Sequence, residues 1–329
     1  MDGGPEATIA DLVKEISSLT QRIQALEGDY YLRRRNSWRY KLQPKVFDFH
    51  QYQPRRLHTP ANYGFPTPNT GALRIAIVTP SYQHAHFLPA TINSVLSQNY
   101  PNLEYVVQDG GSQDGTRDIL ESYGQRIAWN SAADGGQTDA INKGFAAVSG
   151  DIMAYLNSDD VLLPGTLHYV AHAFEKYPKV DFVYGNRIVI DEKGRETARA
   201  VLPPHDSETI KWIDYIPQET MFWRRSVWEK LGAFDTTFQY AMDWDFILRA
   251  QEAGFRFKRL PRFLGCFRVY RSQKTFAMHD VGQEEQDRLR LRSIGPLFRG
   301  GGDIKAAIAG YMKKQVLYHR LYKLGIMRI

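Results

Sequence analysis

The chain has 329 residues, of which 43% are hydrophobic and 24% are charged, and its formal net charge is +6. This length can bury a sizeable core, and the composition is that of an ordinary globular protein, so we expect one catalytic domain with extensions. The single cysteine, Cys266, excludes an internal disulfide. No signal-like apolar segment opens the chain, and no run approaches the ~20 apolar residues that span a bilayer. We therefore expect a cytoplasmic protein.

The positive charge is concentrated near the two ends. Residues 28–56 hold 8 basic and 2 acidic residues, and residues 285–329 hold 10 and 3. Residues 57–284, in contrast, hold 22 basic and 26 acidic residues. The two extensions, rather than the body, are therefore expected to meet any anionic surface. We expect no nucleic acid partner, because the basic and aromatic residues near the N-terminus form no known reading motif.

Residues 1–28 carry a heptad pattern. The apolar positions, spaced alternately by three and four residues, are Ile9, Leu12, Ile16, Leu19, Ile23 and Leu26. Isoleucine at a and leucine at d favour a parallel two-stranded coiled coil, so we expect a homodimer through residues 6–27. The alternative is an amphipathic helix that packs on its own domain. Residues 29–71 follow as a basic segment that contains Pro54, Pro60, Pro66 and Pro68, typical of a linker or an extended arm.

From Leu73 onward, strand-like and helical stretches alternate. The expected strands are 73–79, 103–107, 127–130 and 152–156, and helices are expected at about 87–97, 116–123 and 137–148. This alternation predicts an α/β domain over residues 72–283 with a doubly wound, mostly parallel sheet, whose ligands bind at the carboxyl ends of the strands. Residues 182–190 and 199–202 flank a turn and predict a hairpin.

Residues 284–329 predict a basic helical extension that is interrupted at Gly300-Gly301-Gly302. The mixture of lysines, arginines and apolar side chains fits two arrangements. One is a peripheral contact with an anionic membrane surface, and the other is a helix that packs on the catalytic domain or on a dimer partner. The sequence leaves both open.

Three polar segments follow the expected strands. Asn157-Ser158-Asp159-Asp160 places two adjacent carboxylates at a strand end, where a divalent cation such as Mg²⁺ or Mn²⁺ would relieve their repulsion and could bridge a diphosphate. In the loop 109–116, glycines allow close approach of a ligand, and Asp109 can accept hydrogen bonds from a base or a ribose. Residues 134–144 form the third polar segment, a Gly-containing stretch that leads into a helix. The alternative for each segment is a helix cap or a turn.

Asp243 and Asp245 belong to an expected helix that ends near Gly254. Residues two apart on a helix project about 200° apart, so only one of these carboxylates can face a pocket. The other is expected in solvent or in a pair, with Arg249 as a partner of Asp245 at i+4.

In their order and spacing, these segments together resemble the GT-A fold glycosyltransferases of family 2, over about residues 73–275. The resemblance implies an inverting, metal-assisted transfer of a sugar from a nucleoside diphosphate sugar to an acceptor hydroxyl. It also implies these roles. The donor-binding residues are Thr79, Pro80, Ser81, Tyr82, Asp109, Asp134, Asn142, Lys143, Asn157 and Ser158. The metal ligands are Asp159 and Asp160, the catalytic base is Asp243, and the acceptor side includes Gln218 and Glu219.

One position departs from the family pattern. Many relatives have a metal-reaching histidine where this chain has Tyr270, and a neutral tyrosine is a poor ligand. Arg268, Arg271 and Lys274 are therefore candidates to neutralise the diphosphate. The expected partners are a UDP- or dTDP-type sugar donor and a glycan or lipid-linked acceptor.

Two rival functions follow from the same residues. A nucleotide-sugar pyrophosphorylase would need a Gly-rich basic loop after the first strand, where the chain has Pro80-Ser81-Tyr82. A catalytically silent scaffold that dimerises through residues 6–27 is opposed by the three aspartates Asp159, Asp160 and Asp243.

Overall fold

The structure is a computed structural model that describes residues 37–64, 67–274, 278–327 and 329. The predicted coiled coil of residues 6–27 lies outside this range. Within it, no helix combines the length and the apolar character that a membrane crossing requires. The strands are β1 (Ile75–Ser81), β2 (Leu103–Asp109), β3 (Ala128–Ser131), β4 (Ile152–Tyr155), β5 (Val161–Leu162), β6 (Phe182–Asp191), β7 (Glu196–Ala200), β8 (Phe222–Arg224) and β9 (Phe257–Val269).

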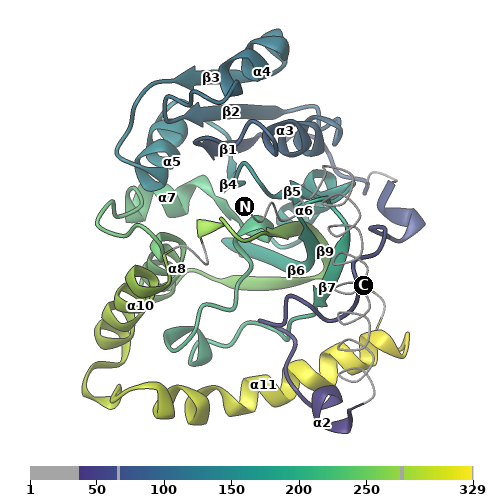
Figure 1. The fold of residues 1–329 in the computed structure, drawn as a ribbon, viewed down its shortest axis with the longest axis vertical. Helices are drawn as coiled ribbons and strands as arrows, with labels where there is room; N and C mark the ends of the chain where they lie inside the picture. The colour runs from purple at the N-terminus through teal and green to yellow at the C-terminus, as the bar shows by residue number, and fades with distance from the viewer. Residues whose placement is uncertain (1–36, 65–66, 275–277, 328) are drawn as a thin grey trace, which may run out of the picture.

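The described strands form one sheet with the order β3-β2-β1-β4-β8-β6-β9-β5, and β7 pairs with β6 (Figure 1). Strands β3, β2, β1 and β4 are parallel neighbours, as are β6 and β9. Strands β8 and β5 pair antiparallel with their neighbours, and β6 and β7 form the predicted hairpin. The predicted mostly parallel sheet is thus confirmed, and its parallel strands bring their carboxyl ends to one edge.

Helices cover both faces of this sheet. They are α2 (Trp38–Lys41), α3 (Leu88–Leu96), α4 (Thr116–Ser122), α5 (Gln137–Ala146), α6 (Thr166–Lys176), α7 (Arg225–Leu231), α8 (Met242–Glu252), α10 (His279–Ile294) and α11 (Gly301–Lys323). Short 3-10 turns are η1 (Ala61–Gly64), η2 (Gly124–Arg126), η3 (Thr209–Lys211), η4 (Gln218–Thr220) and η5 (Gly295–Leu297). The expected helices of the α/β region agree with α3, α4, α5 and α8 to within a few residues.

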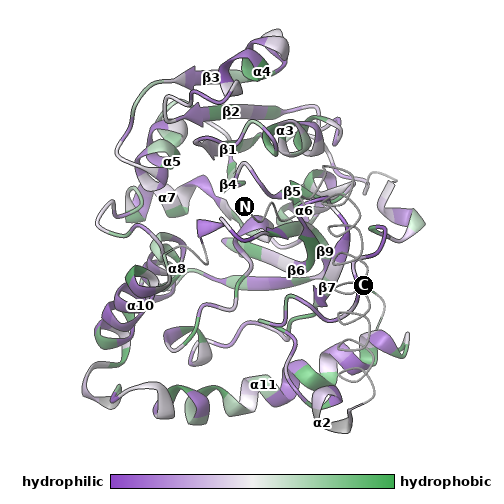
Figure 2. Ribbon diagram, viewed as in Figure 1, coloured by the Kyte–Doolittle hydropathy of each residue, from purple (hydrophilic) through white to green (hydrophobic). Residues whose placement is uncertain are grey.

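The alternation of side chains along the strands divides the core into two layers. In β1, Ile75 and Ile77 pack with α3, α4 and α6, whereas Val78 packs with α5 and α8 on the opposite face. In β4, Ile152 and Met153 are divided between the two layers in the same way. Figure 2 shows hydrophobic residues along the central strands, while α10 is largely hydrophilic. Two buried layers hold the sheet rigid, so the loops at its carboxyl edge are positioned by the core.

The described part of the N-terminal arm packs along the hairpin. The backbone of Gln51 donates to Thr197 at 2.9 Å, and Arg55 forms a bridge with Glu196. The Glu196 side chain is fully buried and accepts hydrogen bonds from Tyr52, Arg55 and Arg199. These bonds fasten the arm to β7.

The C-terminal extension is helical, as predicted, but its interruption lies at residues 295–300, and Gly301 and Gly302 already form the first turn of α11. Helix α11, which runs past the arm in Figure 1, packs against Val46 of the arm and Leu202 after β7, and its Tyr322 hydroxyl accepts a hydrogen bond from Arg199 of β7 at 2.6 Å. The fully buried Gln315 side chain accepts from the Lys45 amide at 2.7 Å and donates to the Val201 carbonyl at 3.0 Å. The outer side of the helix stays exposed, with Leu317 at 53% and Leu324 at 72%. The extension therefore packs on the protein and also presents an apolar and basic face to solvent.

Candidate active site

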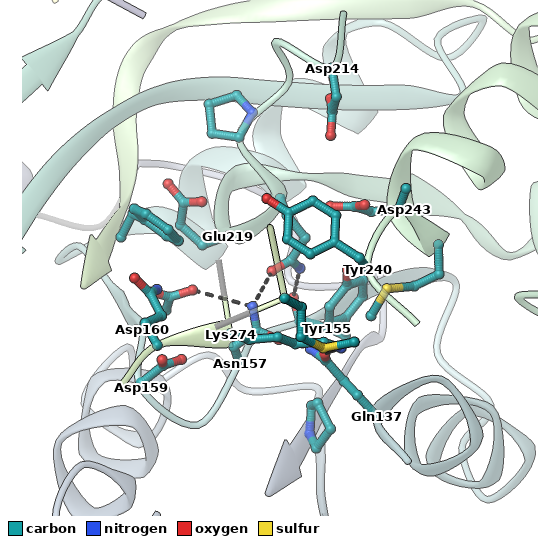
Figure 3. Close-up of a pocket in the computed structure, with 18 of the residues that line it drawn as sticks. Gln137, Tyr155, Asn157, Asp159, Asp160, Asp214, Glu219, Tyr240, Asp243 and Lys274 are labelled. Carbon is teal, nitrogen blue, oxygen red and sulfur yellow. Dashed lines mark hydrogen bonds between the residues drawn. The ribbon is translucent and has the colours of Figure 1, made fainter. Parts of the chain in front are cut away.

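A cavity of about 1120 Å³ opens at the carboxyl edge of the parallel strands. Its walls come from the loops after β1 and β4, from the start of α5 and of α8, and from the segment after β9. The hairpin and the N-terminal arm complete it, since Val46, Phe47 and Phe49 line one side. Segments far apart in the sequence thus converge on one space, shown in close-up in Figure 3.

One end of the cavity is a slot between the loops after β1 and β2. The Tyr82 side chain is 62% exposed, and Gly110 lies between it and Asp134. A Cβ atom added to Gly110 would come within 3.2 Å of both the Tyr82 ring and the Asp134 carboxylate, so glycine keeps the slot open. The buried Ser81 hydroxyl has no hydrogen-bond partner in the structure. An unpaired buried hydroxyl and an exposed aromatic ring suit a polar ligand with a flat ring.

Asp109 supports this slot from behind. Its buried carboxylate accepts hydrogen bonds from the Ser112 amide at 2.9 Å and from the Ser131 hydroxyl at 2.7 Å. It does not line the cavity. The loop 109–116 therefore owes its shape to Asp109, and the carboxylate is already occupied.

Three other predicted donor-side residues also lie outside the lining. Thr79 is buried and pairs with the Tyr105 hydroxyl at 3.1 Å. The Asn142 side chain bonds to the backbone of Phe234, donating at 2.9 Å and accepting at 3.0 Å. Lys143 pairs with Asp139 on the surface of α5 at 2.7 Å. These residues hold the walls in place, and the cavity itself is lined by Pro80, Ser81, Tyr82, Asp134, Asn157 and Ser158.

The loop after β4 places Asp159 and Asp160 on one side of the cavity (Figure 3). Burial and the neighbouring Asp159 carboxylate raise the pKa of Asp160 well above its ordinary value. The Asp159 carboxylate accepts a hydrogen bond from the Tyr270 hydroxyl at 2.8 Å. Burial and Asp159 also raise the pKa of Tyr270. Tyr270, which replaces the histidine of many relatives, thus contacts Asp159 through a neutral hydroxyl.

Arg268 does not face the cavity. Its side chain is buried and donates to the carbonyl oxygens of Asp159, Asp191 and Glu192, and its amide donates to Asp160 at 2.9 Å. These bonds join the loop after β4 to the turn of the hairpin. Arg271 is exposed and lies outside the lining. Of the three predicted diphosphate-neutralising residues, only Lys274 lines the cavity.

Lys274 begins a chain of side-chain hydrogen bonds across the floor of the cavity. Its ammonium group donates to Gln137 at 2.5 Å, Gln137 donates to Asn157 at 2.7 Å, and Asn157 donates to Gln218 at 3.0 Å. Gln218 in turn donates to the Tyr155 carbonyl at 2.7 Å. This chain links the predicted donor side to the predicted acceptor side.

Asp243 and Asp245 separate as predicted. Asp243 lines the cavity, on the side away from Asp159 (Figure 3). Burial raises the pKa of Asp243, although the Trp244 amide donates to its carboxylate at 2.9 Å. Asp245 is buried elsewhere and accepts from Arg249 at 2.8 Å and from Arg292 at 2.5 Å. A carboxylate with a raised pKa in a cavity is suited to accept a proton.

Several lining residues escaped the sequence-based prediction. One is Arg187, whose Nε donates to the predicted acceptor-side residue Glu219 at 2.9 Å. Asp214 faces the cavity near Asp243, and burial together with the Asp243 charge raises the pKa of Asp214. His84 comes from the loop after β1 and contacts Ser158 and Tyr270. A lone acid within the apolar run Trp212–Ile216 was a signal for Asp214, whereas nothing local distinguished Arg187.

The charge of the lining suits a divalent cation. Six acidic residues line the cavity: Asp134, Asp159, Asp160, Asp214, Glu219 and Asp243. Three basic residues also line it: Arg187, Lys274 and Arg290. Across the described ranges, no three carboxylate, imidazole or thiolate side chains cluster to hold a metal by themselves. Cations that bind diphosphates commonly use one or two protein carboxylates and complete their shell with phosphate oxygens and water, so the residues present fit such an ion.

The chain is similar in sequence to proteins named as glycosyltransferases. The chain is 31% identical over 187 residues to an uncharacterised glycosyltransferase of Mycobacterium tuberculosis, covering 55% of this chain and 70% of that protein. It is 30% identical over 180 residues to an uncharacterised glycosyltransferase of Nostoc, covering 50% of this chain and 54% of that protein. The chain thus spans only about half the length of the Nostoc relative.

Solved structures show the same fold. S. aureus TarS in complex with UDP-GlcNAc aligns with a TM-score of 0.56 and 17% identity over 73% of this chain and 72% of that one. The Pyrobaculum calidifontis mannosyltransferase PcManGT, in complex with GDP-Man and Mn²⁺, aligns with a TM-score of 0.52 and 16% identity over 95% of this chain and 86% of that one. The family model "Glycosyl transferase family 2" matches residues 76–274. The chain therefore belongs to glycosyl transferase family 2.

Proposed function

We propose that this chain transfers a glycosyl group from a nucleoside diphosphate sugar to an acceptor hydroxyl, with inversion at the anomeric carbon. The observation that carries the proposal is the placement of Asp159 and Asp243 on different sides of one cavity (Figure 3). The first can serve the leaving diphosphate and the second the attacking hydroxyl. Inversion requires attack from the face opposite the leaving group, which this separation permits.

On the donor side, Tyr82, Gly110 and Asp134 would receive the nucleobase in their slot, with Ser81 available for a hydrogen bond. Asn157 and Ser158 would face the ribose and the diphosphate. We propose a UDP- or dTDP-type donor, in line with the UDP-GlcNAc of the TarS structure. A purine donor such as the GDP-Man of PcManGT is the alternative that a donor screen would distinguish.

Asp159, with Asp160 beside it, would hold a divalent cation of the Mn²⁺ or Mg²⁺ type. Such an ion, when bound, neutralises negative charge on the leaving diphosphate. Lys274 is placed to contribute to the same neutralisation, because it is the predicted cationic candidate that lines the cavity.

On the acceptor side, Asp243 would take the proton of the attacking hydroxyl. Asp214 lies close enough for its pKa to respond to the Asp243 charge. Val46, Phe47 and Phe49 of the arm form an apolar wall, and Phe47 is 53% exposed. This wall supports a glycan or lipid-linked acceptor that carries apolar surface beside its hydroxyls.

We propose two further contacts. A homodimer through residues 6–27 rests on the heptad pattern of the sequence. A peripheral membrane contact rests on the outer face of α11, where Leu317 and Leu324 accompany exposed lysines.

A thermal-shift screen of nucleotide sugars, with and without Mn²⁺ or Mg²⁺, tests the proposal. A donor that binds the folded state raises the melting temperature, by an amount equivalent to about 2.7 kcal/mol at a hundredfold excess over Kd. The stabilising donor is then incubated without acceptor, and slow release of nucleoside diphosphate identifies an active enzyme. Donor binding without any hydrolysis or transfer would favour the silent scaffold, and no stabilisation by any nucleotide sugar would refute the proposal.

A further inference from the structure

His84 lies where a cation ligand would complete the site of Asp159. Its Nδ1 is 2.7 Å from the Ser158 hydroxyl, and its Nε2 is 3.2 Å from the Tyr270 hydroxyl. The same Tyr270 hydroxyl is 2.8 Å from Oδ2 of Asp159. An imidazole nitrogen and a carboxylate oxygen thus converge on one point, which the tyrosine hydroxyl marks. All four side chains line the cavity.

The loop that carries His84 is held in place on both sides of the residue. The Gln83 amide donates to the Ser112 hydroxyl at 2.7 Å, and the Ala85 amide donates to Asp114 at 2.8 Å. The His84 ring also packs edge-on against Phe87, with the ring centroids 6.0 Å apart. The imidazole therefore has a defined position and orientation before any ligand binds.

Ser158 orients the ring in the manner of metal-bound histidines. Such histidines place one ring nitrogen on the metal and use the other in a hydrogen bond that fixes the ring orientation. Here Nδ1 has the serine partner, and Nε2 contacts the Tyr270 hydroxyl, which itself donates to Asp159. A histidine that only joined two loops would not need to share the Tyr270 hydroxyl with the Asp159 carboxylate.

We infer that His84, together with Asp159, is a ligand of the divalent cation, and that it supplies the imidazole which this chain lacks at position 270. The inference rests on the proposed metal-assisted function and adds a ligand to it. Tyr270 would then occupy the shared position in the cation-free protein and yield it on binding. A neutral hydroxyl is a weaker metal ligand than an imidazole, so a bound cation would favour His84 over Tyr270 as its ligand.

A nitrogen ligand also affects which ion is preferred. Mg²⁺ prefers oxygen ligands in a strict octahedron, whereas imidazole suits first-row transition ions. The site should therefore prefer Mn²⁺ to Mg²⁺, and this preference should fall when His84 is removed.

The experiment measures Mn²⁺ binding to the full chain by EPR of free Mn²⁺, with and without UDP. Pulsed EPR of the bound ion then reports ¹⁴N coupling from a coordinated nitrogen. His84→Ala should weaken Mn²⁺ binding by at least the roughly 10- to 100-fold that loss of a residue supporting a ligand produces, and it should abolish the nitrogen coupling. His86→Ala is the matched control, because His86 is an exposed neighbour outside the cavity lining, and it should change neither quantity. Thermal unfolding checks that each variant folds.

Two more variants separate the alternatives. Tyr270→Phe should keep the nitrogen coupling and bind Mn²⁺ at least as tightly, whereas loss of binding in this variant would make tyrosine the ligand and overturn the inference. Asp159→Asn should abolish binding. Wild-type protein that binds Mn²⁺ without nitrogen coupling, and with the same Kd as His84→Ala, would overturn the inference and leave the proposed function standing. Wild-type protein that binds no Mn²⁺ even with UDP would overturn both the inference and the proposed metal dependence.

Discussion

Asp243 and Asp245 lie two residues apart in the first turn of α8, and their carboxylates point to different sides of the helix. Asp243 lines the cavity, and Asp245 is buried between Arg249 and Arg292. The helical geometry alone produces this separation, because two residues advance about 200° around the axis. One carboxylate is therefore available for chemistry, and the other stabilises the helix that carries it.

This pair provides a matched test of the base. Asp243→Asn should lower kcat by roughly 10²–10⁴ because the proton acceptor is lost, while the Kd for the donor nucleotide stays unchanged. Asp245→Asn should lower the melting temperature, because two arginines lose their partner, and should retain most of the activity per folded molecule. Steady-state kinetics and thermal unfolding of both variants check this. Substantial transfer by Asp243→Asn would remove Asp243 from the mechanism.

The rate of transfer should depend on pH through Asp243. Burial raises the pKa of Asp243 above the ordinary aspartate value of about 3.9. The proton-accepting carboxylate form therefore appears at a higher pH than it does in a solvent-exposed aspartate. The rate should therefore fall as pH falls through this raised pKa. Lys274 lowers the pKa of Asp243, so Lys274→Met should move the acidic limb of kcat to higher pH. A pH profile that is unchanged in this variant would show that another group sets the limb.

The slot at Gly110 should be sensitive to a single methyl group. Gly110→Ala places a Cβ within 3.2 Å of the Tyr82 ring and of the Asp134 carboxylate, so nucleotide should bind more weakly while the fold is preserved. Gly310→Ala is the control, because its Cβ would meet nothing within 4 Å. Calorimetric titration with UDP compares the two. Equal affinities would place the nucleobase elsewhere.

The buried Glu196 should make the stability of the arm depend on pH. Its pKa is lowered from 4.5 to about 2, mainly through hydrogen bonds from Arg199, Tyr52 and Arg55 that outweigh the effect of burial. A lowered carboxyl pKa stabilises the fold above pH 4.5, by roughly 3 kcal/mol, and this contribution is lost as pH falls from 4.5 toward 2. Glu196→Gln should therefore unfold at lower urea concentration than the wild type at pH 7, and the difference should shrink below pH 4.5. A constant difference across this range would contradict the linkage.

The outer face of α11 should bind anionic vesicles at low ionic strength. Lys313→Glu with Lys314→Glu should reduce flotation with phosphatidylserine-containing liposomes, because both lysines are exposed on the face that carries Leu317. Lys179→Glu changes an exposed lysine elsewhere and should leave flotation unchanged. Failure of the wild type to float at low salt would remove the membrane proposal.

The sequence predicted the sheet and helices well because their signals are local. Strand β4 is a short apolar run, and the alternation of its side chains predicts that they enter the two core layers on opposite faces of the sheet. The polar residues directly after a strand, such as Asp159, were found for the same reason. Arg268 has the charge of a diphosphate ligand, but its donors face backbone carbonyls, and this orientation depends on how the hairpin packs. His84 reaches the cavity only through long-range packing, which no local pattern encodes. Asp214 has a local signal, an acid within an apolar run, but its proximity to Asp243 again depends on long-range packing.

The arm that lines the proposed acceptor side comes from outside the region matched by the family model. The family model begins at residue 76, whereas Val46, Phe47 and Phe49 precede it and are tied to β7 and α11 through Glu196 and Gln315. Under the proposed function, choice of acceptor and the core chemistry would be encoded in separate stretches of the chain. Exchange of the arm between relatives, with the helix that clamps it, would be a route to new acceptor preferences with an unchanged donor slot.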